Sequence, residues 1–142
     1  MRFAPKTQHA YSCLDTVDMC QFVFGPARNL YSMTQLAEAF RLITGWEVSV
    51  EELMRVGERR LNLLRAYNAR EGIGREADVL PKKLRKALVG GKSDGLAITE
   101  GEIERAKACY YAMSGWEAAC GRPAPAKFGE SDLAWVADEL GI

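Results

Sequence analysis

Apolar residues recur at steps of three and four along much of this chain, the spacing that places one buried stripe on a helix. The longest such segment begins at Ser49, which forms a capping box with Glu52, and it ends near Gly72. Its apolar positions are Val50, Leu53, Met54, Gly57, Leu61 and Leu64. Because Gly57 lies on this stripe without a side chain, we expect a second helix to approach closely there.

Capping residues and glycines around other apolar repeats predict further helices. These run from Ser32 or Thr34 to Gly45, from the Thr99–Glu102 capping box to Gly115, and from Ser131 to Gly141. Phe22-Val23-Phe24 is the best strand candidate, and we interpret it as the continuation of a helix from Asp15. The predicted fold class is therefore all-α: an irregular bundle of five or six short helices, forming a single helical domain over residues 1–142.

Composition narrows the function classes. Lysine plus arginine and aspartate plus glutamate number 19 each, and this zero net charge argues against nucleic-acid binding as the main function. The sequence contains no run of 18 apolar residues, the length that could span a membrane, so no membrane role is expected. The polar N-terminus lacks the apolar segment of a signal peptide, and we therefore expect a cytoplasmic location.

Residues that could carry catalysis are scarce. The only histidine is His9, which we expect near a frayed terminus, so a Ser/His/Asp or Cys/His pair is improbable. The four cysteines, Cys13, Cys20, Cys109 and Cys120, include no Cys-x-x-Cys pair. No glycine-rich phosphate loop follows a strand. A complete catalytic site is therefore not expected in this chain.

One constellation remains, the segment from Cys13 to Cys20, which places Asp15 five residues before the Cys20 thiol. Thiolate is a ligand for iron–sulfur clusters, and a carboxylate can accept two hydrogen bonds from a heterocycle such as a pterin. The alternative interpretation makes Asp15 a helix N-cap and buries Cys20 in the first turns of the helix that follows.

This segment resembles the pattern Asp-x-x-Gly-Leu-Cys of the aldehyde:ferredoxin oxidoreductase family, with Asp18-Met19 in place of the Gly-Leu pair. Other segments resemble the same family, in the same order along the chain. They are Val56–Gly72, Arg75–Pro81, Tyr110–Trp116, Gly121–Pro123 and Leu140–Ile142. Together they cover nearly the whole chain from Asp15 onward.

The resemblance implies the C-terminal helical domain of an enzyme that oxidises aldehydes with a tungsten or molybdenum bis-pterin and one four-iron four-sulfur cluster. It implies that Cys20 is the fourth cluster ligand, that Asp15 accepts hydrogen bonds from a pterin, and that Met19 contacts the pterin. The other three cluster cysteines lie in a Cys-x-x-Cys-x-x-x-Cys motif of the preceding domain, which this chain lacks. A glycine in place of Asp18 would let the backbone approach the cofactor closely.

We therefore expect an excised domain or one half of a split enzyme, with no catalytic residues and no cofactor bound when alone. The resemblance implies as partners an N-terminal pterin-binding domain, a middle helical domain and ferredoxin. An exposed apolar patch near Met19, Phe22 and Phe24 would dock those domains or form a homodimer. The alternative is a helical interaction module with no metal role, which Asp18 favours.

The remaining residues of the resemblance have structural interpretations. We expect Arg59, Arg65, Arg70 and Arg75 to form ion pairs or helix caps rather than to bind ligands. The aromatic side chains Tyr110, Tyr111 and Trp116 are expected in the core or at an interface. Cys109 and Cys120 match no cluster motif, and a ligand role for Cys13 has no support.

Overall fold

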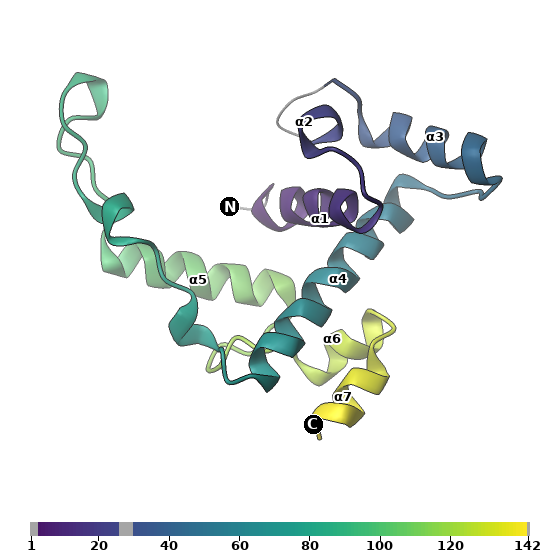
Figure 1. Ribbon diagram of the computed structural model, residues 1–142. Coiled ribbons are helices and arrows are strands. Elements are labelled where there is room, and N and C mark those ends of the chain that lie inside the picture. The colour runs from purple at the N-terminus through teal and green to yellow at the C-terminus, as the bar shows by residue number, and fades with distance from the viewer. Residues whose placement is uncertain (1–2, 26–29, 142) are drawn as a thin grey trace.

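The protein is all-α in the computed structural model, which describes residues 3–25 and 30–141, and no strand occurs within these ranges. Seven α-helices follow one another along the described chain (Figure 1). They are α1 (Phe3–Thr16), α2 (Gln21–Phe24), α3 (Met33–Thr44), α4 (Val50–Arg70), α5 (Glu100–Ser114), α6 (Pro125–Glu130) and α7 (Ala134–Leu140). Three short 3-10 helices lie between α4 and α5: η1 (Arg75–Ala77), η2 (Lys82–Arg85) and η3 (Gly91–Ser93).

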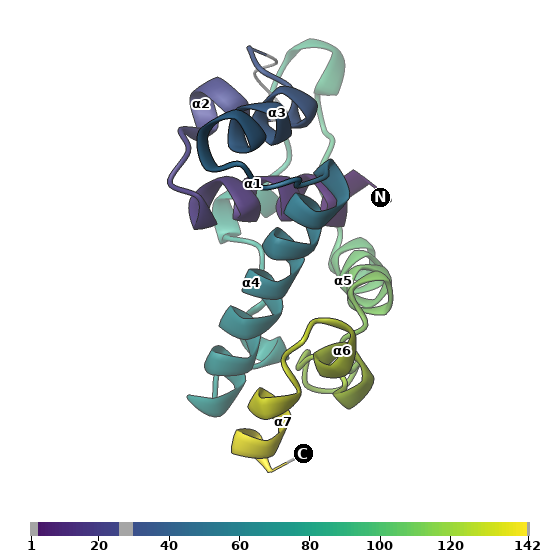
Figure 2. The same ribbon diagram turned by 90° about the vertical axis from the view of Figure 1, so that its right-hand side faces the viewer.

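The long helix α4 is the axis of the molecule, and α1 crosses its N-terminal half (Figure 2). The crossing occurs at Gly57, where an added Cβ atom would lie 1.9 Å from the carbonyl oxygen of His9. The two backbones therefore touch, as expected from the glycine on the apolar stripe. His9 lies inside this contact with only 9% of its surface exposed, so the expectation of a frayed terminus there was wrong.

Two apolar clusters lie at opposite ends of α4. The first joins α1, α3 and α4, and its buried residues are Cys13, Leu14, Leu36, Ala37 and Leu53. The second joins the C-terminal half of α4 to α6 and α7, and its buried residues are Ala66, Phe128, Leu133, Val136 and Ala137. The apolar stripe from which α4 was predicted therefore packs into two separate clusters.

Helix α1 ends at Thr16 because Asp18 takes a left-handed backbone conformation, with φ of 54°. The N–H of Met19 then donates to the carbonyl of Leu14 at 2.9 Å, the bond of a Schellman C-terminal cap. The interpretation of residues 22–24 as a continuation of a helix from Asp15 was therefore wrong. The chain turns after Thr16, and α2 is a separate helix of one turn.

The predicted N-cap role of Ser131 was also wrong, because this residue ends α6. Asp132 has φ of 54°, and the N–H of Leu133 donates to the carbonyl of Phe128 at 2.8 Å. Helix α7 begins only at Ala134, without a side-chain cap. Leu133 and Phe128 are both buried in the second cluster, the apolar contact that usually accompanies this cap.

Residues 79–98, here called the arm, extend away from the helices (Figure 1). The arm doubles back on itself, and the N–H of Leu88 donates to the carbonyl of Leu96 at 2.9 Å. Several of its apolar side chains are exposed, among them Leu84, Leu88, Val89 and Leu96. Within the described ranges, no helix is long and apolar enough to cross a membrane.

Candidate functional site

The junction between α1 and α2, residues 15–21, contains the three residues that sequence reasoning assigned to a cofactor. Asp15 lies in the last turn of α1, so its interpretation as a helix N-cap was wrong. One carboxylate oxygen, Oδ2, is 3.3 Å from Nη1 of Arg60 on α4, and Oδ1 accepts a hydrogen bond from Nε2 of Gln21. These contacts fix the carboxylate beside the first residue of α2.

Cys20 is exposed and immediately precedes α2. The alternative that buried this residue was therefore wrong. Cys13, by contrast, is completely buried in α1, and this burial raises the pKa of its thiol. A thiol that is buried and held protonated cannot offer a thiolate to a metal at the surface. Of the two cysteines in this segment, only Cys20 is accessible.

Asp18 occupies the position at which the resemblance places a glycine, and its left-handed φ is one that glycine adopts without strain. Aspartate tolerates this region better than most residues. Met19, the next residue, is half-buried and packs against the cluster that contains Leu14. The Asp18-Met19 pair therefore forms the C-terminal cap of α1.

The expected exposed patch around Met19, Phe22 and Phe24 is present only in part. Phe22 is 70% exposed. Met19 and Phe24 pack against the first apolar cluster, and Phe24 stacks on Tyr31 with ring centroids 5.3 Å apart. The expectation was wrong for these two residues, because the α1–α2 turn folds them back onto the core.

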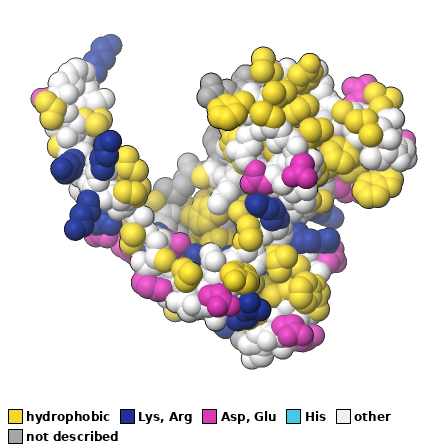
Figure 3. Space-filling view, in the orientation of Figure 1, with side chains coloured by type: hydrophobic (Ala, Val, Ile, Leu, Met, Phe, Trp, Pro, Cys, Tyr) yellow, Lys and Arg dark blue, Asp and Glu magenta, His cyan; other side chains and the backbone are white. Residues whose placement is uncertain are grey.

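A larger apolar exposure lies at the end of α3, where Leu42, Ile43 and Trp46 are 81%, 77% and 69% exposed. We call these three residues the α3 apolar surface. Hydrophobic side chains gather over the region of α2 and α3 in the space-filling view (Figure 3). Leu36 and Ala37, one to two turns earlier in the same helix, are buried, so the apolar side chains of α3 leave the core toward its C-terminal end. Large exposed apolar side chains gathered in one place are typical of a surface that another protein segment covers.

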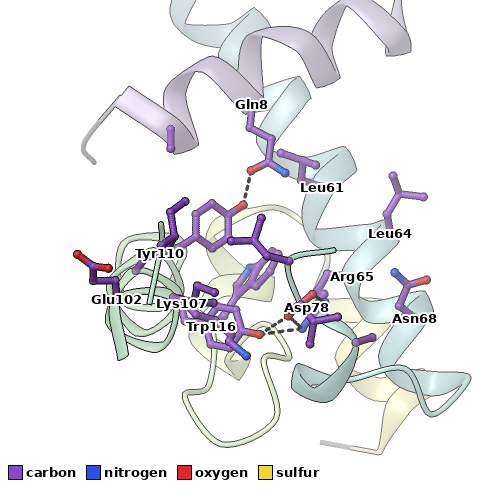
Figure 4. Close-up of a pocket in the computed structure, with 18 residues that line it drawn as sticks. Gln8, Leu61, Leu64, Arg65, Asn68, Asp78, Glu102, Lys107, Tyr110 and Trp116 are labelled. Atoms are coloured by element: carbon purple, nitrogen blue, oxygen red, sulfur yellow. Dashed lines mark hydrogen bonds and ion pairs between the residues drawn. The ribbon is translucent and has the colours of Figure 1, made fainter. Parts of the chain in front are cut away.

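A second constellation lies in the C-terminal half of α4, around the buried guanidinium group of Arg65 (Figure 4). Its Nη1 and Nη2 atoms donate to the two carboxylate oxygens of Asp78, at 2.9 and 2.6 Å. Its Nε donates to the carbonyl of Gly121 at 2.7 Å, and its Cζ lies 5.0 Å from the ring centroid of Trp116. We call this arrangement the Arg65 clamp.

The hydroxyl of Tyr111 donates a hydrogen bond to the same Asp78 carboxylate. Burial and this bond raise the pKa of Tyr111 to about 12. Although burial alone would raise the pKa of Asp78, the hydrogen bonds from Arg65 and Tyr111 hold it below its usual value. Each nitrogen of the Arg65 guanidinium is thus hydrogen-bonded and its charge is paired with Asp78, so the clamp is not a free cation for a ligand.

A groove of about 770 Å³ opens beside the clamp, between α4 and α5. Tyr110 lines it and donates a hydrogen bond to Gln8 of α1, so the groove is closed on that side by α1 (Figure 4). No group of three or more histidine, cysteine, aspartate or glutamate side chains that could hold a metal ion occurs among residues 3–25 and 30–141. The groove is thus an open hollow between helices, and no such group lies among the described residues that line it.

The other arginines of the resemblance also form ion pairs, as expected. Arg59 pairs with Asp132, Arg70 with Glu71, and Arg75 with Glu104. These contacts connect α4 to the turn before α7, and η1 to α5. None of these arginines is left free for a phosphate or a carboxylate ligand.

The sequence model of the family described as "Aldehyde ferredoxin oxidoreductase, domains 2 & 3" matches residues 1–133. The chain belongs to the aldehyde ferredoxin oxidoreductase family. No curated protein sequence matches it. A solved structure, the active site complex BamBC of benzoyl coenzyme A reductase in complex with 1,5 dienoyl-CoA, contains a chain of similar fold, with a TM-score of 0.75 at 19% identity.

That alignment covers 96% of the present chain and 19% of the chain it is compared with. At this identity the likeness concerns the fold. The chain is therefore a helical portion of the aldehyde ferredoxin oxidoreductase family, and it spans about one fifth of the length of that structural neighbour.

The segments that carry the resemblance to aldehyde ferredoxin oxidoreductases meet at the Arg65 clamp. Arg65 comes from Val56–Gly72, and its partners Asp78, Tyr111 and Gly121 come from three of the other segments. Sequence reasoning identified Arg65 as structural, but it did not identify these partners. It also missed Gln21, the partner of Asp15, because no pattern in the sequence distinguishes that side chain.

Proposed function

We propose that residues 1–142 form the C-terminal helical domain of a tungsten- or molybdenum-pterin, iron–sulfur aldehyde:ferredoxin oxidoreductase. The proposal rests on the family match and on one observation at the α1–α2 junction: Asp18 keeps a left-handed backbone and Cys20 stays at the surface. A thiol that follows a fixed helix end in this way can reach an iron atom held by another domain. The chain itself is not catalytic in this proposal.

Cys20 would supply one thiolate to a four-iron four-sulfur cluster whose other three ligands come from the preceding domain. The junction fits this role as a single ligand, because Cys20 is exposed while Cys13 is buried. The exposed cysteines Cys109 and Cys120 lie on and after α5, in other parts of the fold. We therefore propose that the isolated chain binds neither cofactor.

Asp15 would accept hydrogen bonds from one pterin ring. Its two oxygens have about four acceptor positions, of which Arg60 and Gln21 use two, so capacity remains for a further donor. The ion pair with Arg60 also holds the carboxylate in place before a cofactor arrives. Met19 would contact the pterin only through the part of its side chain that the first cluster leaves exposed.

When bound, the metal–pterin group supplies the oxidation chemistry and the cluster passes electrons onward. The partners in this proposal are the N-terminal pterin-binding domain and the middle helical domain, present as further chain or as another subunit. Ferredoxin would accept electrons from the whole enzyme, in the cytoplasm. The α3 apolar surface and Phe22 would be covered by these domains or by a homodimer.

The decisive experiment purifies the chain without air, alone and after co-expression with a polypeptide that carries the pterin-binding domain and the Cys-x-x-Cys-x-x-x-Cys motif. Iron, sulfide, tungsten and molybdenum are measured in both samples. We expect metal and aldehyde oxidation only in the co-expressed sample. Aldehyde oxidation by the chain alone would overturn the proposal.

The Cys20→Ser variant tests the ligand assignment within the co-expressed complex. We expect it to retain the complex and lose iron and sulfide, whereas Cys109→Ser, at another exposed cysteine, should keep both. Asp18→Gly should also keep both, because glycine adopts the same φ. Full iron content in Cys20→Ser would exclude Cys20 as a ligand.

The second candidate is a helical interaction module without a metal role, which the exposed side chains of the α3 apolar surface support. Asp18 no longer favours this candidate, because its backbone conformation is one that glycine also adopts. A stable complex with the upstream polypeptide that contains no metal would favour the module.

A further inference from the structure

The zero net charge of the chain conceals a separation of charge along the molecule. The arm, residues 79–98, has five basic residues and one acidic residue, a net charge of +4. Residues 130–141 have four acidic residues and no basic residue, a net charge of −4. The arm and α7 lie at opposite ends of the molecule in both ribbon views (Figures 1 and 2).

An apolar groove of about 980 Å³ lies between the arm and α5. Its apolar lining comes from Leu84, Leu88, Leu96, Ile98 and Ala106. The charged residues that line it are Lys83, Lys86, Arg105 and Glu102. Three cations and one carboxylate thus surround an apolar floor, a net charge of +2 on the rim. Hydrogen bonds from Thr99 and the charge of the nearby Arg105 lower the pKa of the Glu102 carboxyl group, whereas Lys83 and Lys86 have no ion-pair partner among the described residues.

The exposed face of α7 has the complementary arrangement. Trp135 is 58% exposed, and the exposed carboxylates of Asp138 and Glu139 follow it at three and four residues, on the same face of the helix. Neither carboxylate has an ion-pair partner among the described residues. Val136 and Ala137 are buried in the second cluster, so α7 stays fixed while this face points outward.

We propose that the groove between the arm and α5 receives the Trp135 face of α7 from a second copy of this chain. Trp135 would enter the apolar groove, and Asp138 and Glu139 would pair with Lys83 and Lys86 on its rim. An aromatic side chain in an apolar pocket, surrounded by paired charges, is the usual centre of a protein interface. This inference does not depend on the proposed function, because it involves no residue of the α1–α2 junction.

The contact is head-to-tail, since the arm and α7 lie at different ends of one molecule (Figure 1). Repeated contacts of this kind close into a ring or extend into a chain of copies. The arm contains no aromatic residue on which a nucleic-acid base could stack, so its positive charge fits an acidic protein surface better than single-stranded nucleic acid.

The test measures association of the full chain by sedimentation velocity over a range of protein and salt concentrations. We expect self-association that weakens as salt increases, because screening reduces attraction between exposed charges. The double variants Lys83→Glu/Lys86→Glu and Asp138→Lys/Glu139→Lys should each weaken association by at least about tenfold. Lys82→Glu/Lys92→Glu is the matched control, because it makes the same charge change on the arm outside the groove lining.

A mixture of the groove double variant with the α7 double variant distinguishes this contact from others. Each variant alone has like charges on both surfaces, but the acidic groove of one matches the basic α7 face of the other. The mixture should therefore regain association, and the tryptophan fluorescence of the chain should shift to shorter wavelength as Trp135 is buried. A chain that stays monomeric, or association that survives both reversals, overturns the proposal, and so does a mixture that stays dissociated.

Discussion

At the scale of single residues, the sharpest constraint in the fold is the space at Gly57. A Cβ atom there would lie 1.9 Å from the carbonyl oxygen of His9, and this oxygen belongs to backbone that cannot rotate away. We therefore expect Gly57→Ala to force α1 and α4 apart and to lower the free energy of unfolding by about 3 kcal/mol. Urea denaturation followed by circular dichroism measures this change.

Gly129 in α6 is the control for this substitution, because no atom outside its chain neighbours and its own helix backbone lies within 4 Å of the Cβ position there. Gly129→Ala should leave stability unchanged or raise it by up to about 1 kcal/mol, through the better helix propensity of alanine. Equal effects of the two substitutions would show that helix packing at Gly57 is not what matters.

The Arg65 clamp gives a prediction with a pH dependence. Replacement of Asp78 with asparagine leaves the buried Arg65 guanidinium without its counter-charge, and we expect a loss of about 3 kcal/mol at neutral pH. Because the folded state lowers the pKa of Asp78 from its ordinary value of 3.8, the ion pair stabilises the protein above that value. Its contribution is lost as the pH falls through the folded-state pKa.

The difference in unfolding free energy between the wild-type chain and Asp78→Asn should therefore stay constant between about pH 7 and about pH 5, and it should shrink as the pH falls below 3.8. Urea titrations at several pH values measure it. Glu71→Gln is the comparison, because Glu71 forms an exposed pair with Arg70 and should change stability by less than about 1 kcal/mol. A difference for Asp78→Asn that stays constant with pH would contradict the assigned role.

The residues of the α1–α2 junction and of the Arg65 clamp show how much of the candidate site the sequence could predict. Asp15 and Cys20 were assigned to a cofactor by spacing and by resemblance, since both belong to one short segment, and this assignment stays a prediction. The partners of Arg65 could not be found in this way. Arg65 and Tyr111 are 46 residues apart, and only the packing of α5 against α4 brings them together. Patterns of local periodicity contain no information about such contacts.

At the scale of helices, the sequence left two candidates for the N-cap of α3, and the structure selects Ser32. Its hydroxyl accepts a hydrogen bond from the N–H of Gln35 at 3.2 Å, and the Gln35 side chain binds the Ser32 N–H in return. We expect Ser32→Ala to cost about 1 kcal/mol. Thr34→Ala, at the second residue of the same helix, should cost less than about 0.5 kcal/mol, and thermal unfolding of the two variants measures both.

The ends of the helices were predicted where glycine forms them and missed where aspartate does. Gly72 and Gly115 were identified as the stops of α4 and α5, and both have positive φ. Asp18 and Asp132 form the same left-handed caps, but aspartate is far less specific for this conformation than glycine. The interruption between α1 and α2, and the late start of α7, therefore escaped the sequence analysis.

At the scale of the whole molecule, the all-α class was predictable from capping boxes and apolar periodicity. The projection of the arm was not, because residues 79–98 show no apolar repeat from which their packing could be predicted. Its position follows from the Arg65 clamp, which holds Asp78 directly before the arm, and from the capping box of α5 directly after it. Both ends of the arm are fixed by tertiary contacts or caps, while the middle of the arm makes few tertiary contacts.

The last prediction concerns the α3 apolar surface, which the chain leaves open to solvent. Because Leu42 and Ile43 are 81% and 77% exposed, they contribute little to the fold of the chain alone. The double variant Leu42→Gln/Ile43→Gln should therefore keep its unfolding free energy within about 0.5 kcal/mol of the wild-type value. It should at the same time reduce co-purification with the upstream pterin-binding polypeptide, since that surface is suited to contact with another domain.

Val89→Gln on the arm, at a 96% exposed apolar residue, is the control and should leave co-purification unchanged. Equal co-purification of both variants would place the interface elsewhere on the molecule.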